Sequence, residues 1–276
     1  MIESQEQLKK ISLFDDFSTK FNGFISALEC QKNSLQEVII DQCIYDTEVE
    51  VLKSCRNLEI LRIKFCTKKL MKSLENKIST LEITNFEIDA STIVQIFEKA
   101  GTLLQRLKLE SANEILNENF LLETLKFNCP NIKYLNISKI KFSTQFLELV
   151  DNLQKLQFLS FSYSVEDIPE EELKIRVMQF AEILPLTLQY LDVQGDTYIV
   201  KYMDIFLNHC NASLKNLLIN NIYNEKITKA IIDYCIRNKT LKYVGVFKYS
   251  SLSYNIRKQM ERHVKLVSYQ SIFVDC

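Results

Sequence analysis

The sequence predicts an α/β solenoid, a curved horseshoe in which a parallel sheet lines the concave side and helices cover the convex side. Three observations carry this prediction. A short apolar motif recurs along the whole chain, the stretches between its copies show helical periodicity, and only four Gly and three Pro interrupt the 276 residues. Because no linker rich in Gly, Ser or Pro divides the chain, we expect a single domain over residues 1–276.

The recurring motif is apolar-x-x-apolar-x-apolar. On a β-strand its fourth and sixth positions lie two residues apart and therefore share one face, while the first position enters the same core from the preceding turn. The ten copies are Leu8/Ile11/Leu13, Leu35/Val38/Ile40, Leu58/Leu61/Ile63, Ile78/Leu81/Ile83, Leu104/Leu107/Leu109, Ile132/Leu135/Ile137, Leu156/Leu159/Phe161, Leu188/Leu191/Val193, Leu214/Leu217/Ile219 and Leu241/Val244/Val246.

The spacing of the copies identifies the type of repeat. Successive first residues are about 26 positions apart on average, and leucine-rich repeats are 20–29 residues long. We therefore predict about ten leucine-rich repeats, with a first strand near residues 8–13 and a last strand near residues 241–246. Residues 247–276 would form a C-terminal cap, with a helix over residues 256–267 and a terminal strand over residues 271–274.

Helices are predicted between the strands by apolar residues at i, i+3, i+4 and i+7. The sets are Ile93/Ile96/Phe97/Ala100, Phe146/Leu149/Val150/Leu153, Val177/Phe180/Ala181/Leu184 and, less completely, Ile227/Ile231/Tyr234. A capping box at Thr47 and Glu50 is typical of a further helix start. An acidic run around Pro169, Glu166 to Glu172, favours a helix N-terminus over the alternative of a docking site for a basic partner.

Composition excludes several classes of partner. The formal net charge is −1, from 34 Lys and Arg against 35 Asp and Glu, so the basic excess of a dedicated nucleic-acid binder is missing and no nucleic acid is expected. The N-terminal residues do not resemble a signal peptide, and no apolar run approaches the roughly 20 residues of a transmembrane helix. We therefore expect no membrane association and a cytoplasmic or nuclear location.

Catalytic and metal-binding motifs are absent from the sequence. Its eight cysteines form no CxxC pair, and its two histidines, His209 and His263, lie in predicted helices without a Cys or Ser partner. The sequence also lacks GxGxxG, GxxxxGK[ST], HExxH and GxSxG. We predict a protein that is not an enzyme, with no catalytic residues, no cofactor and no metal, and with cysteines that serve as small buried apolar residues.

The motif resembles a known family at several of its copies. Leu35-x-x-Val38-x-Ile40-x-x-Cys43 and Leu58-x-x-Leu61-x-Ile63-x-x-Cys66 match the LxxLxLxxC form of cysteine-containing leucine-rich repeats. The junctions SCRNLEILRI (Ser54–Ile63) and NCPNIKYLNI (Asn128–Ile137) are similar to the helix-to-strand joint of that class. Such repeats are typical of F-box/leucine-rich-repeat proteins and of ribonuclease-inhibitor-like solenoids.

The resemblance implies a protein-binding function. In F-box/leucine-rich-repeat proteins the F-box recruits components of a cullin-type ubiquitin ligase and the repeats hold the target protein. We expect the target-recognition region of such a receptor, although the first motif begins at Leu8 and leaves no room for an F-box before it. The alternative is a stand-alone scaffold or inhibitor-like binding protein unrelated to ubiquitin.

The non-core strand positions suggest where a protein partner binds, because they face the concave side. Two groups stand out, and in each the alternative is that the side chains only pack or pair with their neighbours on adjacent strands. The first is a mixed-charge patch of Arg62, Lys64, Glu82, Arg106, Lys108 and Glu110, and the second is a broken aromatic ladder of Tyr134, Phe158, Tyr190 and Tyr243. The predicted partner-binding residues are the four aromatic residues together with Arg62, Arg106 and Lys108.

Overall fold

The computed structural model describes residues 7–14, 29–42, 52, 54–65, 77–165, 168–195, 198–222 and 224–272. Over this part of the chain it has an α/β fold in which strands alternate with helices and eleven strands form one parallel sheet in chain order, β1 to β11. The chain divides into two compact units, the first made of Met1–Ile132 and Ile137–Lys139 and the second of Lys133–Asn136 and Ile140–Cys276.

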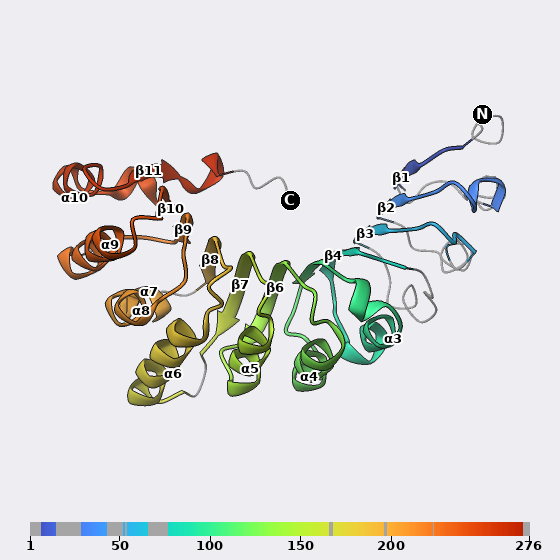
Figure 1. Cartoon of the computed structure of the whole chain (residues 1–276), viewed down its shortest axis with the longest axis horizontal. Helices are drawn as coiled ribbons and strands as arrows, with labels where there is room; N and C mark the ends of the chain where they lie inside the picture. Colours follow the sequence, from blue (N-terminus) through green and yellow to red (C-terminus); the bar gives the residue numbers. More distant parts are fainter. Residues whose placement is uncertain are drawn as a thin grey trace. The chain divides into compact units, whose positions relative to one another are not determined.

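The first unit contains the following elements. Its strands are β1 (Lys10–Phe14), β2 (Glu37–Asp41), β3 (Ile60–Lys64), β4 (Thr80–Phe86) and β5 (Arg106–Ser111), and its helices are α3 (Ala90–Ala100), the 3-10 turn η2 (Gly101–Leu103) and α4 (Glu118–Asn128). Figure 1 shows α3 and α4 on one side of strands β4 and β5. The core of this unit lies between those two helices and the strands.

The second unit continues the alternation from β6 (Tyr134–Lys141), whose middle residues belong to the first unit. Its further elements are α5 (Thr144–Asn152), β7 (Phe158–Ser164), α6 (Glu170–Ile183), β8 (Tyr190–Gly195), α7 (Tyr198–Lys201), α8 (Met203–His209), β9 (Asn216–Ile219), α9 (Glu225–Asn238), β10 (Tyr243–Val246), η3 (Tyr249–Ser251), α10 (Tyr254–Met260), β11 (Lys265–Ser268) and η4 (Tyr269–Ser271). Helices α5, α6, α8 and α9 lie on one side of β7 to β10 (Figure 1).

The motif predicts the strands residue by residue. Each of the ten strands β1 to β10 begins at the third position of its motif. In β1 to β5 and in β7 to β10 neighbouring strands pair motif position by motif position, as in Val38↔Leu61 and Leu191↔Leu217. The fourth and sixth positions are buried in every copy. The sheet face that carries positions 3 and 5, opposite the helices, is called the helix-free face below.

Successive copies are joined by a repeated backbone connection. The carbonyl oxygen at the second motif position accepts hydrogen bonds from two consecutive amides of the next copy, as Gln157 does from Gln189 at 2.9 Å and Tyr190 at 3.0 Å. The same pattern starts at Lys9 and recurs at Lys215. Because an unpaired buried amide is costly, this double acceptance fixes where each strand begins relative to its neighbour.

Side chains just before the motif add a second connection between copies. Asn57 Nδ2 donates to the carbonyl of Asn33 at 2.6 Å, and Asn131 Nδ2 donates to the carbonyl of Thr102 at 2.7 Å. In the second unit the hydroxyl of Thr187 lies between two acceptors, the carbonyl of Gln154 at 3.0 Å and that of Leu156 at 2.7 Å. Except for the contact with Leu156, each bond links the position before one motif to the position two residues before the preceding motif.

The predicted helices are present where the described residues cover them, and α3, α5, α6 and α9 bury the apolar sets that predicted them. The described part of the acidic run begins a helix as expected, since Pro169 occupies the N-cap position of α6 and Glu170, Glu171 and Glu172 fill its first turn. Glu166 and Asp167 lie outside the described residues. Thr47, Glu50, Cys43 and Cys66 lie outside the described residues.

The predicted boundaries near the C-terminus were wrong. Helix α10 ends at Met260, not at residue 267, and the last strand within the described residues is Lys265–Ser268. Of the predicted strand 271–274, Ser271 ends the 3-10 turn η4, and residues 273–274 lie outside the described residues. His263 consequently lies in the turn between α10 and β11 and not in a helix. The cause is a degenerate eleventh motif: β11 pairs in register with β10, but its first and sixth positions are His263 and Ser268 where the other copies have apolar residues.

Candidate functional site

The charged residues of the first unit form a chain of ion pairs across five strands of the helix-free face. Lys10 Nζ lies 3.1 Å from Glu37 Oε1, and Arg62 pairs with the same carboxylate. Arg62 Nε also lies 3.0 Å from Glu82 Oε2, and Arg106 Nε lies 2.7 Å from Glu82 Oε1. Positive and negative charges thus alternate from β1 to β5, which stabilises the strand order and register.

Glu82 is the centre of this chain of ion pairs. Burial acts to raise the pKa of its carboxyl group, but the hydrogen bond from Arg106 and the charges of Arg106, Arg62 and Lys108 outweigh burial and hold the pKa below its usual value. Arg62 and Arg106 are therefore engaged with carboxylates of neighbouring strands. Lys108 in turn pairs with Glu110 at 3.0 Å.

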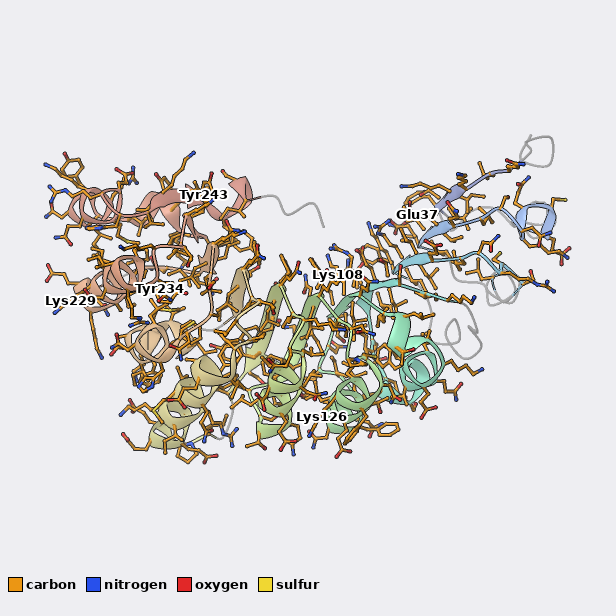
Figure 2. The ribbon with its side chains drawn as sticks, viewed as in Figure 1. Glu37, Lys108, Lys126, Lys229, Tyr234 and Tyr243 are labelled. Atoms are coloured by element: carbon orange, nitrogen blue, oxygen red, sulfur yellow. The ribbon has the colours of Figure 1, made fainter. Side chains whose placement is uncertain are left out.

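Arg62 and Arg106 thus pair with carboxylates on adjacent strands, as the alternative interpretation of the patch describes, whereas Lys108 pairs with Glu110 on its own strand, β5. Figure 2 shows Glu37 and Lys108 on the strand side of the first unit, whereas Lys126 projects from α4 on the helix side. A partner that used Arg62 or Arg106 would first have to replace an existing pair of about 0.2–1 kcal/mol if exposed, and more where burial reduces screening.

The aromatic residues of the second unit stack across consecutive strands. The rings of Tyr134 and Phe158 have centroids 3.9 Å apart with planes inclined by 10°, and those of Phe158 and Tyr190 are 4.1 Å apart and inclined by 13°. All three occupy the third motif position, so adjacent strands about 4.8 Å apart bring the rings face to face.

These three aromatic residues are not exposed, contrary to expectation. Only 9% of Tyr134, 7% of Phe158 and 7% of Tyr190 is accessible to solvent. They form a cluster with the buried Leu218, and Tyr269 and Ile272 pack against this cluster. The C-terminal segment therefore covers the helix-free face at the aromatic stack.

A hydrogen-bond network fixes the covering segment. The hydroxyl of Tyr269 donates to Oδ2 of Asp192 at 2.8 Å, and the hydroxyl of Ser160 donates to the same oxygen at 3.1 Å. Asp192 and Ser160 hold the fifth motif position of β8 and β7 and are almost fully buried, Asp192 to 2% exposure. No short-range sequence pattern points to this network, because Tyr269 lies 77 residues from Asp192.

Gly245 makes room for the segment. A Cβ atom at this position of β10 would come within 2.9 Å of Leu218 Cγ and 3.0 Å of Ile272 Cδ1, both closer than ordinary contact distance. Leu218 and Gly245 are register partners on β9 and β10. Together they form a shallow apolar seat for the side chain of Ile272.

Tyr243 differs from the other predicted aromatic residues. It pairs in register with Asn216, which interrupts the stack as expected, and it remains 37% exposed. Its ring lies 5.6 Å from Lys265 Nζ on β11, a cation–π contact. Of the predicted aromatic ladder, Tyr243 alone is accessible to a partner in the structure described (Figure 2).

An open groove lies on the helix side of the second unit. It lies between α5 and α6, has a volume of about 330 Å³, and is lined by Thr144, Leu147, Glu148, Asp151, Gln179 and Ile183. Two buried cysteines have raised pKa values: burial raises the pKa of Cys129 to about 12 and that of Cys210 to about 11. Of the cysteines in the described residues, Cys30 departs from the expected burial and is exposed.

The described residues contain neither a metal-binding cluster nor a membrane-spanning helix. No group of three or more His, Cys, Asp or Glu side chains within them is placed to hold a metal ion. None of the helices in the same residues has the length and apolar character needed to cross a bilayer.

Comparison with known proteins supports the fold class alone. No protein-family model matches the sequence, and no curated protein matches it either. A crystal structure of a Bacteroides fragilis protein, determined as a structural-genomics target, is similar over 96% of this chain and 74% of its own, with a TM-score of 0.55 and 14% sequence identity. At this sequence identity the likeness supports the fold alone.

Proposed function

We propose that this chain is a leucine-rich-repeat solenoid that binds a segment of another protein on the helix-free face of its second unit. The repeat assignment is supported by the strict positional pairing of the strands and by the burial of motif positions 4 and 6. The function is supported by one observation above all. That face already holds a polypeptide segment of the chain itself, through the apolar contacts of Tyr269 and Ile272 and the hydrogen bond to Asp192.

A protein partner fits this face better than a nucleic acid does. Affinity for nucleic acid depends on cations that neutralise phosphates, and the cations Arg62 and Arg106 of the first unit already pair with Glu37 and Glu82. The helix-free face of the second unit is aromatic and aliphatic, with a buried carboxyl group at its centre. Aromatic anchors beside isolated polar groups are typical of protein interfaces.

A narrower form of the proposal follows from the family resemblance. The repeats would then be the target-recognition region of an F-box-type ubiquitin-ligase receptor, and the bound segment would belong to the protein to be ubiquitinated. The alternative is a stand-alone scaffold or inhibitor-like protein with the same binding face. In either form the chain is a non-enzymatic binding module.

Site-specific photocrosslinking tests the binding face. A photoreactive phenylalanine analogue replaces Tyr243 on the helix-free face or, as a matched control, Ile236 on α9, which is 57% exposed on the helix side. After irradiation in native extract, we expect a defined protein to be crosslinked from position 243 and not from position 236. Recovery of a cullin-type ligase component together with that protein would support the narrower form.

The opposite pattern contradicts the proposal. If crosslinks form from position 236 alone, the helix side is the binding surface. If neither position yields a protein other than general chaperones, while both variants keep the circular dichroism spectrum of the native chain, the protein-binding function is wrong.

A further inference from the structure

The C-terminal segment Tyr269–Ile272 contacts the helix-free face through two side chains three residues apart. Tyr269 reaches Asp192 with its hydroxyl and packs its ring at 5.9 Å from that of Phe247, and Ile272 rests on Leu218 and Gly245. The residues between them, Gln270 and Ser271, are exposed. One side of the segment therefore holds it to the sheet through two anchor side chains, and the two polar residues between the anchors face solvent.

The seat has a defined chemistry at each anchor. At the first, the carboxyl oxygen of a nearly fully buried Asp192 accepts a hydrogen bond from a phenolic hydroxyl, next to a second donor, Ser160. At the second, the absence of a Cβ at Gly245 leaves space that an aliphatic side chain fills. A site that hydrogen-bonds a hydroxyl discriminates strongly against an analogue that lacks it, because the buried acceptor then loses a partner.

The segment is held weakly compared with the strands beneath it. It follows the four-residue strand β11 at the end of the sheet, and both anchors are only partly buried, whereas Phe158 and Leu218 below them are almost completely buried. Segments with few buried contacts open at a lower free-energy cost than core strands do. The contacts of Tyr269 and Ile272 can therefore be exchanged without unfolding the sheet.

We propose that Tyr269–Ile272 is an internal ligand that occupies the partner-binding seat, and that the partner binds through a tyrosine followed three residues later by an aliphatic residue. This inference rests on the proposed protein-binding function and specifies both its ligand and its control. The partner segment displaces the C-terminal segment, since Asp192 and Gly245 accommodate one such pair of anchors at a time.

Competition by the tethered C-terminal segment should weaken the binding of a separate peptide by a measurable factor. A tethered segment acts at an effective concentration on the order of millimolar. A separate peptide with a dissociation constant of about 100 µM for the vacant seat would then bind the native chain roughly tenfold more weakly. Removal of both internal anchors should restore the full affinity.

The test uses the full-length chain and a fluorescein-labelled peptide with the sequence of residues 266–274. Its binding is followed by fluorescence polarisation with the native protein and with the Tyr269→Ala/Ile272→Ala variant, which removes the two anchors and leaves the sheet intact. Two control peptides carry Tyr269→Phe or Ile272→Asp, so that the binding face itself is not altered. Circular dichroism verifies that the double variant is folded.

We expect the peptide to bind the double variant at least tenfold more tightly than the native protein, and we expect either substitution in the peptide to reduce that affinity at least fivefold. Equal binding to both proteins would place the peptide elsewhere and overturn the proposal. So would the absence of binding to the folded double variant. In either case a crosslink from position 243 would still support the protein-binding function, so the two proposals fail separately.

Discussion

Replacement of Phe158 by leucine should measure the contribution of the aromatic stack. Leucine keeps most of the apolar volume but removes both face-to-face contacts, to Tyr134 at 3.9 Å and to Tyr190 at 4.1 Å. Each aromatic pair is worth about 0.5–1.5 kcal/mol beyond the area it buries, so the expected loss in the free energy of unfolding is about 1–3 kcal/mol. Replacement by alanine should cost about 3–5 kcal/mol, because it also leaves a cavity.

The measurement is urea denaturation followed by far-ultraviolet circular dichroism, with hydrogen exchange of the β7 and β8 amides to report on the second unit itself. Tyr254→Leu is a matched control, since this aromatic residue is 74% exposed on α10 and its loss should change stability by no more than about 0.5 kcal/mol. If Phe158→Leu is as neutral as the control, the stacked rings contribute only packing volume and the reasoning about them is refuted.

Three further predictions concern other parts of the sheet. Glu82→Gln should lower the free energy of unfolding by about 1–2 kcal/mol at neutral pH. The folded-state pKa of Glu82 is depressed, so the stability difference between native protein and variant should be complete above the ordinary glutamate pKa of about 4.3. It should vanish as the pH falls through the folded-state pKa. Urea titrations at several pH values check it, and a difference that grows toward acid would contradict it. Asn131→Ala should lower the free energy of unfolding by about 1 kcal/mol, because it removes the hydrogen bond to the carbonyl of Thr102. Asn131→Asp keeps a side-chain oxygen but loses the donor, so it should be no more stable than the alanine variant. Equal stability of the native protein and the alanine variant in thermal denaturation would argue against that bond. Gly245→Ala should lower the free energy of unfolding by about 1–3 kcal/mol, because its added Cβ meets Leu218 and Ile272. It should also speed hydrogen exchange in residues 265–272. Unchanged exchange in these residues would contradict the prediction.

The strands could be predicted from the sequence because one motif indicates both where each strand lies and which of its residues are buried. Leu107 and Leu109 in β5 are a typical case, buried as the fourth and sixth positions require. Helix α4 was not predicted, since Phe120 and Phe127 are exposed apolar residues that blur the buried stripe of Leu121, Leu122 and Leu125. Short-range periodicity cannot distinguish such exposed residues from buried ones.

The candidate site could be predicted only in part, for a different reason. The third motif position aligned Tyr134, Phe158 and Tyr190 correctly, and their stacking follows from the strand spacing. Their burial depends on Tyr269 and Ile272, which lie far along the chain and fall in no recognisable motif. Likewise, the motif placed Arg62, Glu82 and Arg106 on the same face, but the diagonal pairs between positions 3 and 5, Arg62 with Glu37 and Arg106 with Glu82, required the structure.

The burial of the strands has a consequence for how the protein can change over time. In β2 and β3 buried and half-exposed residues alternate, so a mutation at a half-exposed position leaves the core untouched. Among these positions, Glu37 and Arg62 are constrained by their ion pair and the others are not part of it. In β6 and β7 the first four residues are all buried, Asn136 and Ser160 included. A substitution there must satisfy the core and the covering segment at once. We therefore expect natural variation to concentrate in the first strands and to be sparse around the aromatic stack.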